Sequence, residues 1–497
     1  MDYIDLEKLA FRSLLALGMS MFLTVVVSMI VSWYRLRHIP GPWLASVSNI
    51  WMIRAATSKR LSEAFERAGS SYGPLVRIGP NQILTSDADF LRKTGAVRGA
   101  YTRSQWYAAF RWQPYVDSVF NFSDYVSHDT RRAQISTAYN ITGHEVDLIE
   151  PSIDEQILLM LHALRTKYVP KHDKPNPPLL DFSDFSSFLT MDVITRAAFG
   201  EEFGHLRSDS DVTGFLTQLR EHWAMISLVN ETPFLRSLFC SKMWLRLFGP
   251  NITDAGGIGK LMSGVVRIVH QRYAKPETQL RNDMLQESEA EGMQALIAGS
   301  ETTASVMRIT FLCLISSPPI YNKLKEAVRE AIESGNVTEP ISYNMAREIP
   351  YLRAVVYEGM RMRPGTTGSF SKVVPPQGEV VQGKFIPGGT LVAMNVPAML
   401  RSAELFGSDA HLFRPERWLQ ASGDKQAEMK DQVEMMFGSG RWMCAGKPIT
   451  YMELFKTFFE LFRHFDFMIA YPDKPWNSKC YNVYVEDNMW IKVAEAA

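Results

Sequence analysis

The sequence predicts a mainly α-helical protein with a small β-sheet subdomain, preceded by one N-terminal transmembrane helix. Most of the chain carries apolar residues at helical spacing. Short segments bounded by Gly and Pro, at residues 72–85 and 379–395, are typical of strands joined by tight turns. Residues 14–33 contain no charged side chain and have about the length that one helix needs to cross a bilayer.

Composition limits the classes of partner and compartment. The chain has 497 residues, with 53 basic and 53 acidic side chains, so no net field would attract nucleic acid. The four cysteines, Cys240, Cys313, Cys444 and Cys480, form no Cys-x-x-Cys pair. This spacing indicates neither a disulfide framework nor a zinc knuckle, and it favours a reducing compartment.

Three segments organise the chain. Residues 1–33 are expected to be a membrane anchor, residues 34–45 a proline-rich hinge, and residues 46–497 a single soluble body. A cleaved signal peptide is the alternative for the first segment, although a clear cleavage site is missing. Charge counts on the two sides of the span are equal, so they do not set its orientation. Glycans would place the body in the lumen if they occurred on the sequons Asn121, Asn140, Asn230, Asn251 and Asn336.

The segment from Phe437 to Lys447 is the most informative stretch. Its glycines allow a sharp turn and a close approach to a flat ligand, and they bracket Cys444. A helix is expected just after Pro448, and its first amide groups would stabilise negative charge on the sulfur. We interpret Cys444 as a thiolate ligand of haem iron covered by the ring of Phe437. A structural thiol filling the core is the alternative.

A long helix is expected from Ser288 to Ser316, opened by a Ser-x-x-Glu capping box and ended by Pro318. Near its middle Gly299 thins one face, and Thr302 can bond back to a carbonyl one turn earlier. The acid Glu301 beside this hydroxyl suggests a proton relay next to a small-molecule cavity. A solvated polar helix face is the alternative interpretation.

Two further stretches are predicted to support this region. A helix beginning at Pro350 and ending before Pro364 places Glu358 and Arg361 on one face, where Arg417 could join them in a buried network. The aromatic residues between 101 and 122 are more typical of core. Because Arg103 and Arg111 lie among them, we also expect a loop partly open to solvent that lines an apolar pocket.

Taken together in this order, these elements resemble the cytochrome P450 family of haem-thiolate monooxygenases, most closely the fungal microsomal members related to pisatin demethylase. The resemblance covers nearly the whole chain and implies that Cys444 is the proximal iron ligand. It implies that Glu301 and Thr302 support proton delivery, and that Gly299 makes room above the metal. It also implies a structural role for Glu358, Arg361 and Arg417.

The resemblance further implies contacts to the haem propionates. Lys372 and Arg132 fall at positions that often make them, and His128 is a second candidate beside Arg132. The family commonly has an arginine two residues before the cysteine, but here that residue is Trp442 and the arginine is Arg441. A propionate contact from Arg441 is therefore an open question. The connection from Met284 to Glu291 is also shorter than is usual in such relatives.

The expected function is oxidation of an apolar small molecule by a membrane-anchored monooxygenase, such as hydroxylation of a fungal terpenoid or polyketide. The expected cofactor is haem b, with electrons from NADPH through a flavoprotein reductase and cytochrome b5 as a further donor. The expected location is the endoplasmic reticulum membrane, with a single span and the body in the cytosol. Three alternatives stay open: demethylation of plant defence compounds, haem-thiolate isomerisation or dehydration, and non-catalytic binding.

Overall fold

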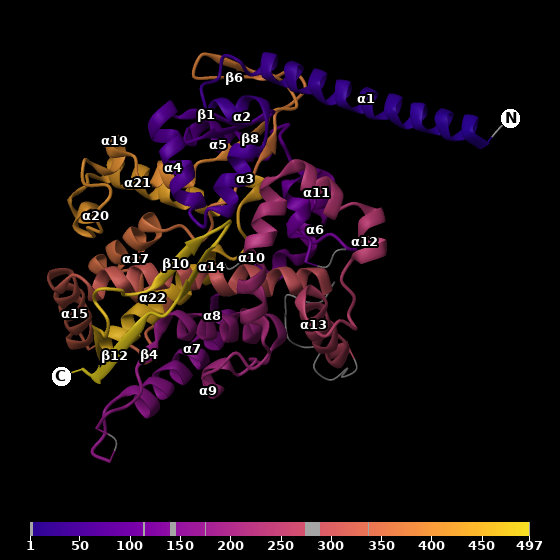
Figure 1. Ribbon diagram of the computed structural model, residues 1–497. Coiled ribbons are helices and arrows are strands. Elements are labelled where there is room, and N and C mark those ends of the chain that lie inside the picture. The colour runs from indigo at the N-terminus through magenta and orange to yellow at the C-terminus, as the bar shows by residue number, and fades with distance from the viewer. Residues whose placement is uncertain are drawn as a thin grey trace.

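Figure 1 shows the computed structural model, which describes residues 3–112, 115–139, 146–173, 175–273, 289–335 and 337–496. Helix α1 projects from one end of a body in which helices surround several small sheets. The predicted class, mainly α with a small β subdomain, is confirmed. The helices are α1 (Tyr3–Arg35), α2 (Trp43–Val47), α3 (Ile50–Thr57), α4 (Leu61–Tyr72), α5 (Ala88–Gly95), η1 (Gln105–Phe110), α6 (Tyr125–Tyr139), α7 (Val146–Ala163), η3 (Leu164–Tyr168), α8 (Phe182–Phe199), α9 (His205–Ser208), α10 (Phe215–Glu231), α11 (Pro233–Phe239), α12 (Lys242–Phe248), α13 (Gly257–Tyr273), α14 (Glu289–Ile315), α15 (Pro318–Glu333), α16 (Tyr343–Ala346), α17 (Pro350–Met362), α18 (Val396–Leu400), α19 (Ala403–Phe406), α20 (Glu416–Gln420), α21 (Gly423–Glu434), η5 (Met435–Phe437), η6 (Gly440–Trp442) and α22 (Lys447–His464).

The strands form four small sheets. The largest has the order β1-β2-β8-β5-β3, and the others pair β10 with β11, β6 with β7, and β4, β12 and β9 in a row. The strands are β1 (Leu75–Gly79), β2 (Gln82–Thr85), β3 (Thr102–Arg103), β4 (Leu180–Asp181), β5 (Lys372–Val373), β6 (Glu379–Val381), β7 (Lys384–Ile386), β8 (Leu391–Met394), β9 (Phe465–Ile469), β10 (Asn477–Cys480), β11 (Tyr484–Asp487) and β12 (Trp490–Glu495).

The predicted hairpin at residues 72–85 is confirmed, with β1 and β2 antiparallel and Val76 opposite Leu84. The expectation for residues 379–395 is confirmed only in part. Strand β8 joins the largest sheet by running parallel to β2, whereas β6 and β7 pair only with each other. Figure 1 shows this β6–β7 hairpin at the edge of the body near the base of α1.

Helix α14 is the central element of the body. Its 27 residues give a length of about 40 Å, and it packs against α8, α17 and α22. The stacked rings of Phe182 and Phe311, with centroids 4.0 Å apart, mark the contact between α8 and α14. The helix ends at Ile315, before the predicted stop at Pro318, whereas the predicted cap Ser288 lies outside the described residues.

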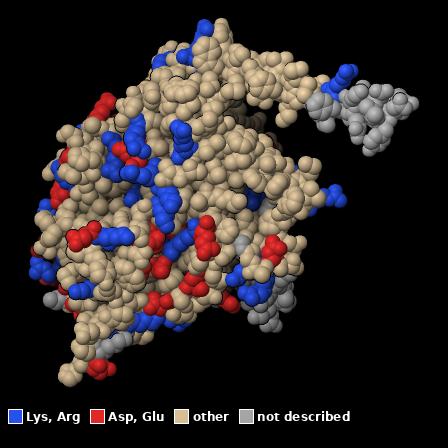
Figure 2. All heavy atoms as spheres, in the orientation of Figure 1, with Lys and Arg blue, Asp and Glu red and all other residues tan. Residues whose placement is uncertain are grey.

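Helix α1 contains the predicted span. Its segment Leu15–Arg35 has a mean hydropathy of 2.2 and none of it is buried. In Figure 2 the described length of this helix is almost free of charged side chains, whereas acidic and basic groups are mixed over the body. The described part of the chain therefore contains one straight helix that is long and apolar enough to cross a membrane.

The hinge is attached to the body at β1. The Arg77 guanidinium donates to the carbonyl oxygens of Ser32 and Trp33 in the last turn of α1, at 2.9 and 3.2 Å. The Arg77 backbone N–H donates to the Pro40 carbonyl at 2.7 Å. A cation at the carboxyl end of a helix is favourable because the last carbonyls lack intrahelical partners. These bonds fix where the helix leaves the body.

Candidate active site

The loop before α22 places Cys444 at the amino end of that helix. Gly438 and Gly440 have φ angles of +76° and +53°, in the left-handed region where glycine is favoured. A Cβ on Gly440 would also lie 2.1 Å from the Gly95 carbonyl oxygen. The Cys444 backbone N–H donates to the Phe437 carbonyl at 2.7 Å and closes the turn. The predicted glycine-dependent turn at 438 and 440 is thus confirmed.

The Cys444 thiol is accessible, yet its pKa is raised chiefly because protein surrounds it. The sulfur is therefore open to a ligand although many protein atoms lie around it. Backbone N–H groups of Gly446 and Lys447 and the positive charges of Arg132 and Lys447 oppose this rise in pKa. These groups would stabilise a thiolate, the form that binds a metal ion.

One face of α14 is accessible near its middle. Ala298 is exposed and Thr302, one turn later, is partly exposed, although most of the helix is buried. The Thr302 hydroxyl donates to the Ala298 carbonyl at 2.7 Å, as the sequence predicted. Thr303, the next residue, lies with its hydroxyl 3.2 Å from that of Thr450 in α22. The open face of α14 is therefore near the helix that begins beside Cys444.

Gly299 lies at the contact between α14 and α8. A Cβ at this position would lie 2.7 Å from Cγ1 of Ile194 in α8. The absence of a side chain at Gly299 thus allows α8 and α14 to approach closely. Gly299 is itself only half-buried and lies three positions before Thr302, on the same side of the helix, so its role in making room above a ligand stays a prediction.

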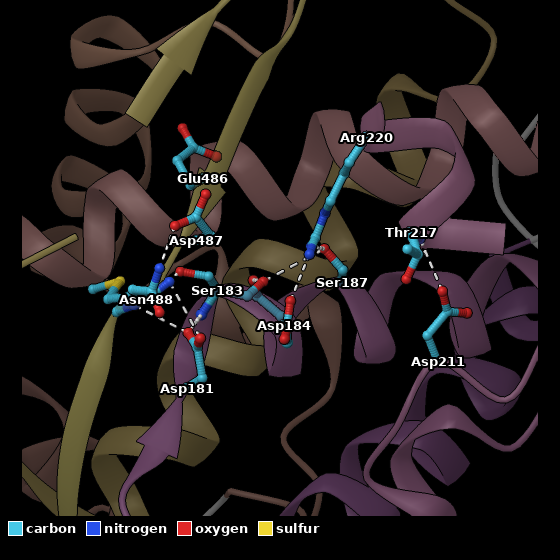
Figure 3. Close-up of polar contacts among 12 residues, drawn as sticks. Asp181, Ser183, Asp184, Ser187, Asp211, Thr217, Arg220, Glu486, Asp487 and Asn488 are labelled. Carbon is cyan, nitrogen blue, oxygen red and sulfur yellow. Dashed lines mark hydrogen bonds and ion pairs between the residues drawn. The ribbon is translucent and has the colours of Figure 1, made fainter. Parts of the chain in front are cut away.

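Glu301 lies in a buried ion network on another side of α14. Its carboxylate accepts from Arg308 at 3.1 Å, from Arg220 at 3.2 Å and from the Ser187 hydroxyl at 2.9 Å. Figure 3 shows Arg220 reaching from α10 to Asp184 and Ser187 of α8. Glu486 continues the network, 2.8 Å from Arg308, and pairs in turn with Arg363.

This network sets the protonation state of Glu301. Burial would raise the pKa of Glu301, but the charges of Arg220 and Arg308 and the Ser187 hydrogen bond outweigh it and hold the pKa at about 2. The carboxylate is therefore ionised near neutral pH. Glu301 and Thr302 are neighbours in sequence, but their side chains bond to different groups.

A second cluster contains cations without counterions. The Lys372 ammonium donates to the Tyr107 hydroxyl at 2.6 Å, and Arg103 donates to the carbonyls of Val119 and Phe120. Arg103 also lies over the ring of Trp442, 4.5 Å from its centroid. Among the described residues no carboxylate lies within 4.0 Å of the charged groups of Arg103 or Lys372.

Burial lowers the pKa values of the basic side chains in this cluster. Burial lowers the pKa of Arg103 to about 10, and burial together with the Arg103 charge lowers the pKa of Lys372 well below its usual value. The pKa of His128 falls to about 4 for the same two reasons. Its ring lies 4.4 Å from that of Trp442, while Arg132 donates to the Met443 carbonyl at 3.2 Å. Such a site is suited to an anionic ligand that would neutralise the cations.

The predicted network on α17 forms as expected. Glu358 accepts from Arg361 at 2.7 and 2.8 Å and from Arg417 at 2.9 Å, and both the acid and Arg361 are fully buried. The Trp418 indole donates to the same carboxylate at 2.9 Å. Arg361 continues to the carbonyls of Leu400, Ala410 and Leu412. The network joins α17 to the chain that leads to Cys444.

Comparison with known proteins identifies the family. The cytochrome P450 family model matches residues 39–486. The chain belongs to the cytochrome P450 family. It is 40% identical to cytochrome P450 monooxygenase aba1 of Botryotinia fuckeliana, over 93% of this chain and 92% of the relative. Cytochrome P450 monooxygenase abl1 of Leptosphaeria maculans is 37% identical over 91% of this chain and 82% of its own length.

The comparison also bears out the predicted subgroup. Pisatin demethylase of Fusarium vanettenii is 26% identical over 90% of this chain and 88% of its own length. The chain is thus related to fungal P450 monooxygenases, with closer likeness to aba1 and abl1 than to pisatin demethylase. Membership of the P450 family implies a haem-thiolate centre.

The residues of this structure fit a haem. Its two carboxylates would neutralise the buried cations Arg103 and Lys372, which lie over the ring of Trp442, two residues before the accessible thiol of Cys444. The ring of Phe437 is 9% exposed. It precedes the Cys444 loop and packs beside the ring of Tyr451 in α22. The orphaned Nε of Arg103, which has no hydrogen-bond partner among the described residues, is a further sign of a polar ligand at this place.

Arg441, the other candidate for a contact to a haem propionate, has protein partners in the structure. Its guanidinium donates to the Val97 carbonyl, lies 3.4 Å from Asp129 and covers the ring of Tyr125. These partners are protein groups, and Asp129 already neutralises the charge. Arg441 thus helps to pack α6 against the Cys444 loop, but its Nε and Nη1 are buried without a hydrogen-bond partner among the described residues, so a contact to the haem stays a prediction.

Sequence reasoning missed three functional side chains. Arg103 was expected in a loop partly open to solvent, but it is 7% exposed beneath Tyr107 and Phe120. Arg220 and Arg308 were not singled out, although each neutralises Glu301. For Arg308 the signal was present in the sequence, since a cation seven residues after Glu301 falls on the same helix face. Arg103 and Arg220 carry no such local signal.

Proposed function

We propose that this chain is a membrane-anchored P450 monooxygenase that inserts oxygen into an apolar small molecule, with Cys444 as the iron ligand. The observation that carries the proposal is the placement of an accessible, amide-stabilised thiol next to the open face of α14, with unpaired cations beside it. When bound, haem supplies the redox centre at which oxygen is activated.

The protein groups have separate tasks in this reaction. Arg103 and Lys372, with Arg132 and His128 nearby, would bind and orient the carboxylates of haem. Thr302 would hold a proton at its Oγ1 and release it toward the reaction face, because its hydrogen bond to Ala298 is local and can be exchanged. Ionised Glu301 would orient the Thr302 segment through its hydrogen bonds from Arg220 and Arg308.

The same family relationship supports a proposal for the electron donor and for the cellular location of the protein. We infer NADPH-derived electrons delivered by a membrane-bound flavoprotein reductase, with cytochrome b5 as a further donor. The apolar helix α1 supports attachment to the endoplasmic reticulum membrane with the body in the cytosol. Asn121 and Asn230 are 6% and 0% exposed, which is unfavourable for glycosylation and is compatible with a cytosolic body.

The substrate class is an apolar fungal secondary metabolite. The rings of Trp106 and Phe110 in η1 pack with that of Trp223 in α10, next to Tyr107 of the Arg103 cluster, which supports an apolar wall for an apolar ligand. Relatives named as monooxygenases of fungi support oxidation over a non-redox rearrangement. The residues do not favour a terpenoid over a polyketide.

Replacement of the proposed iron ligand tests the function. Cys444→Ser should remove the thiolate-type absorption band of the reduced carbon monoxide complex, because a hydroxyl is a weak ligand for iron. Absorption spectra of the wild type and variant, at matched haem content, check this. An unchanged band in the variant would exclude Cys444 as the ligand.

A further inference from the structure

Four segments that are far apart in sequence meet at one buried carboxylate. Glu231, the last residue of α10, is 1% exposed. It accepts hydrogen bonds from the Trp106 indole at 2.9 Å, from the Ser369 backbone N–H at 3.1 Å and from the Asn482 amide at 2.6 Å. The Ser369 hydroxyl donates to its second oxygen. Three of the donors bond to one carboxylate oxygen and the Ser369 hydroxyl bonds to the other.

Hydrogen bonds and the nearby charge of Arg236 stabilise the buried carboxylate of Glu231. Burial raises the pKa of Glu231, and the hydrogen bonds from Ser369 and Trp106 and the nearby charge of Arg236 oppose the rise. A buried carboxylate that accepts several hydrogen bonds is costly to disturb, because each donor would otherwise lose its partner. Glu231 is thus a rigid junction and not a solvated surface acid.

The loop of residues 365–370 connects this junction with the reaction face. At one end a Cβ on Gly365 would lie 3.0 Å from Cβ of Thr302. At the other end a Cβ on Gly368 would lie 2.6 Å from the Trp106 ring and 2.7 Å from the Asn482 amide. Between them the Thr367 N–H donates to the Asn482 carbonyl at 2.8 Å. The loop therefore lies directly against Thr302, Trp106 and the turn at Asn482.

Backbone strain marks the same loop. Phe370 has a φ of +44°, which is unusual for a residue with a side chain and is kept only where surrounding contacts stabilise it. Its ring lies 4.6 Å from that of Trp106. The preceding Ser369 is held by Glu231 on one side and by Gln82 and the Met394 N–H on the other. These contacts stabilise the strained conformation.

We propose that Glu231 is a positioning residue that determines substrate specificity, by tying Trp106, the 365–370 loop and the turn at Asn482 into one rigid wall of the pocket next to Thr302. The proposal deepens the proposed function and rests on it. Loss of the carboxylate leaves Trp106 and Phe370 free to move. A bulky apolar ligand that touches this wall then loses affinity, whereas a small ligand that binds only at the iron does not.

The experiment compares two iron-binding probes, imidazole and the larger phenylimidazole, in titrations followed by the shift of the main haem absorption band. In full-length Glu231→Ala we expect phenylimidazole to bind about fivefold more weakly and imidazole to bind as in the wild type. Trp106→Phe keeps an aromatic ring, although a smaller one, and removes the indole donor, so it should show a smaller loss for phenylimidazole. Asp466→Asn, which removes a carboxylate that accepts from Tyr321 far from this wall, is the control and should change neither affinity.

The outcomes separate this proposal from the function on which it rests. Equal affinities of Glu231→Ala and wild type for phenylimidazole would overturn the positioning role, and so would a parallel loss for both probes. If Glu231→Ala does not fold, Trp106→Phe tests the proposal instead. The quantity compared with the wild type is then the ratio of its affinities for phenylimidazole and imidazole. A wild-type chain that shows no haem band at all would instead contradict the proposed function itself.

Discussion

The Arg308 guanidinium lies 3.1 Å from the Glu301 carboxylate, two turns away on the same helix and equally buried. Together with Arg220 it keeps a carboxyl whose pKa burial alone would raise ionised at neutral pH, in the middle of α14. The network continues through Glu486 to Arg363, so positive and negative groups alternate across the interior. Each buried charge therefore has a neighbour of opposite sign. This pairing offsets the free-energy cost of removing the charges from water.

Glu301→Gln should destabilise the protein by about 3 kcal/mol near neutral pH, because it leaves two buried arginines poorly compensated. The folded-state pKa of Glu301, about 2, lies below its ordinary value of 4.5. Its contribution to stability is therefore present above pH 4.5 and is lost as the pH falls toward 2. Denaturant unfolding in detergent should show that the difference between the wild type and the variant shrinks below pH 4.5. Glu326→Gln, in an exposed pair with Arg329, is the control, and a difference independent of pH would contradict the assignment.

Thr302→Ala should separate reductant use from product formation. Without the hydroxyl no side-chain oxygen of this turn holds a proton on the open face, so reduced oxygen would be released without oxidising the substrate. Simultaneous measurement of NADPH consumed, peroxide released and product formed checks this. Thr310→Ala, whose hydroxyl bonds to Val306 in a buried turn, is a matched control. Tight coupling in Thr302→Ala would count against the proton role.

Arg103→Leu should weaken haem retention about tenfold, because it removes a buried cation that a haem carboxylate would neutralise. The rate of haem transfer to excess apomyoglobin measures the effect. Arg441→Leu is the matched control, since Arg441 already has Asp129 and Val97 as partners, and we expect at most a small change. Faster loss of haem from Arg441→Leu than from Arg103→Leu would show that the haem carboxylates contact Arg441.

Deletion of residues 1–33 should release the body from membranes, because the segment contains nearly all of the apolar span. Flotation of the full chain and the truncated chain with phospholipid vesicles checks the expectation. Full retention of the truncated chain would refute the anchor as the main attachment. It would then direct attention to exposed apolar side chains of α11 and α12, among them Phe234, Met243 and Phe248.

Local patterns were sufficient to predict several elements. The Gly-Pro-Asn turn gave the β1–β2 hairpin, Pro350 and Pro364 bounded α17, and the glycines around Cys444 gave its loop. Glu358 and Arg361 were predictable because their spacing fixes them on one helix face, and the structure places Arg417 with them. In each case residues close in sequence determine the conformation.

What the sequence determined by itself is the helix-rich class, the long apolar N-terminal helix, the cysteine loop and the bond of Thr302 to Ala298. Tertiary structure decided their partners: Gly299 contacts Ile194, Arg441 pairs with Asp129, and Arg103 lies on Trp442. Tertiary structure alone also brought Glu231 to Trp106, Ser369 and Asn482. The physical reason is that helix and turn propensities act over a few residues, whereas charge compensation in the core depends on which distant segments packing brings together.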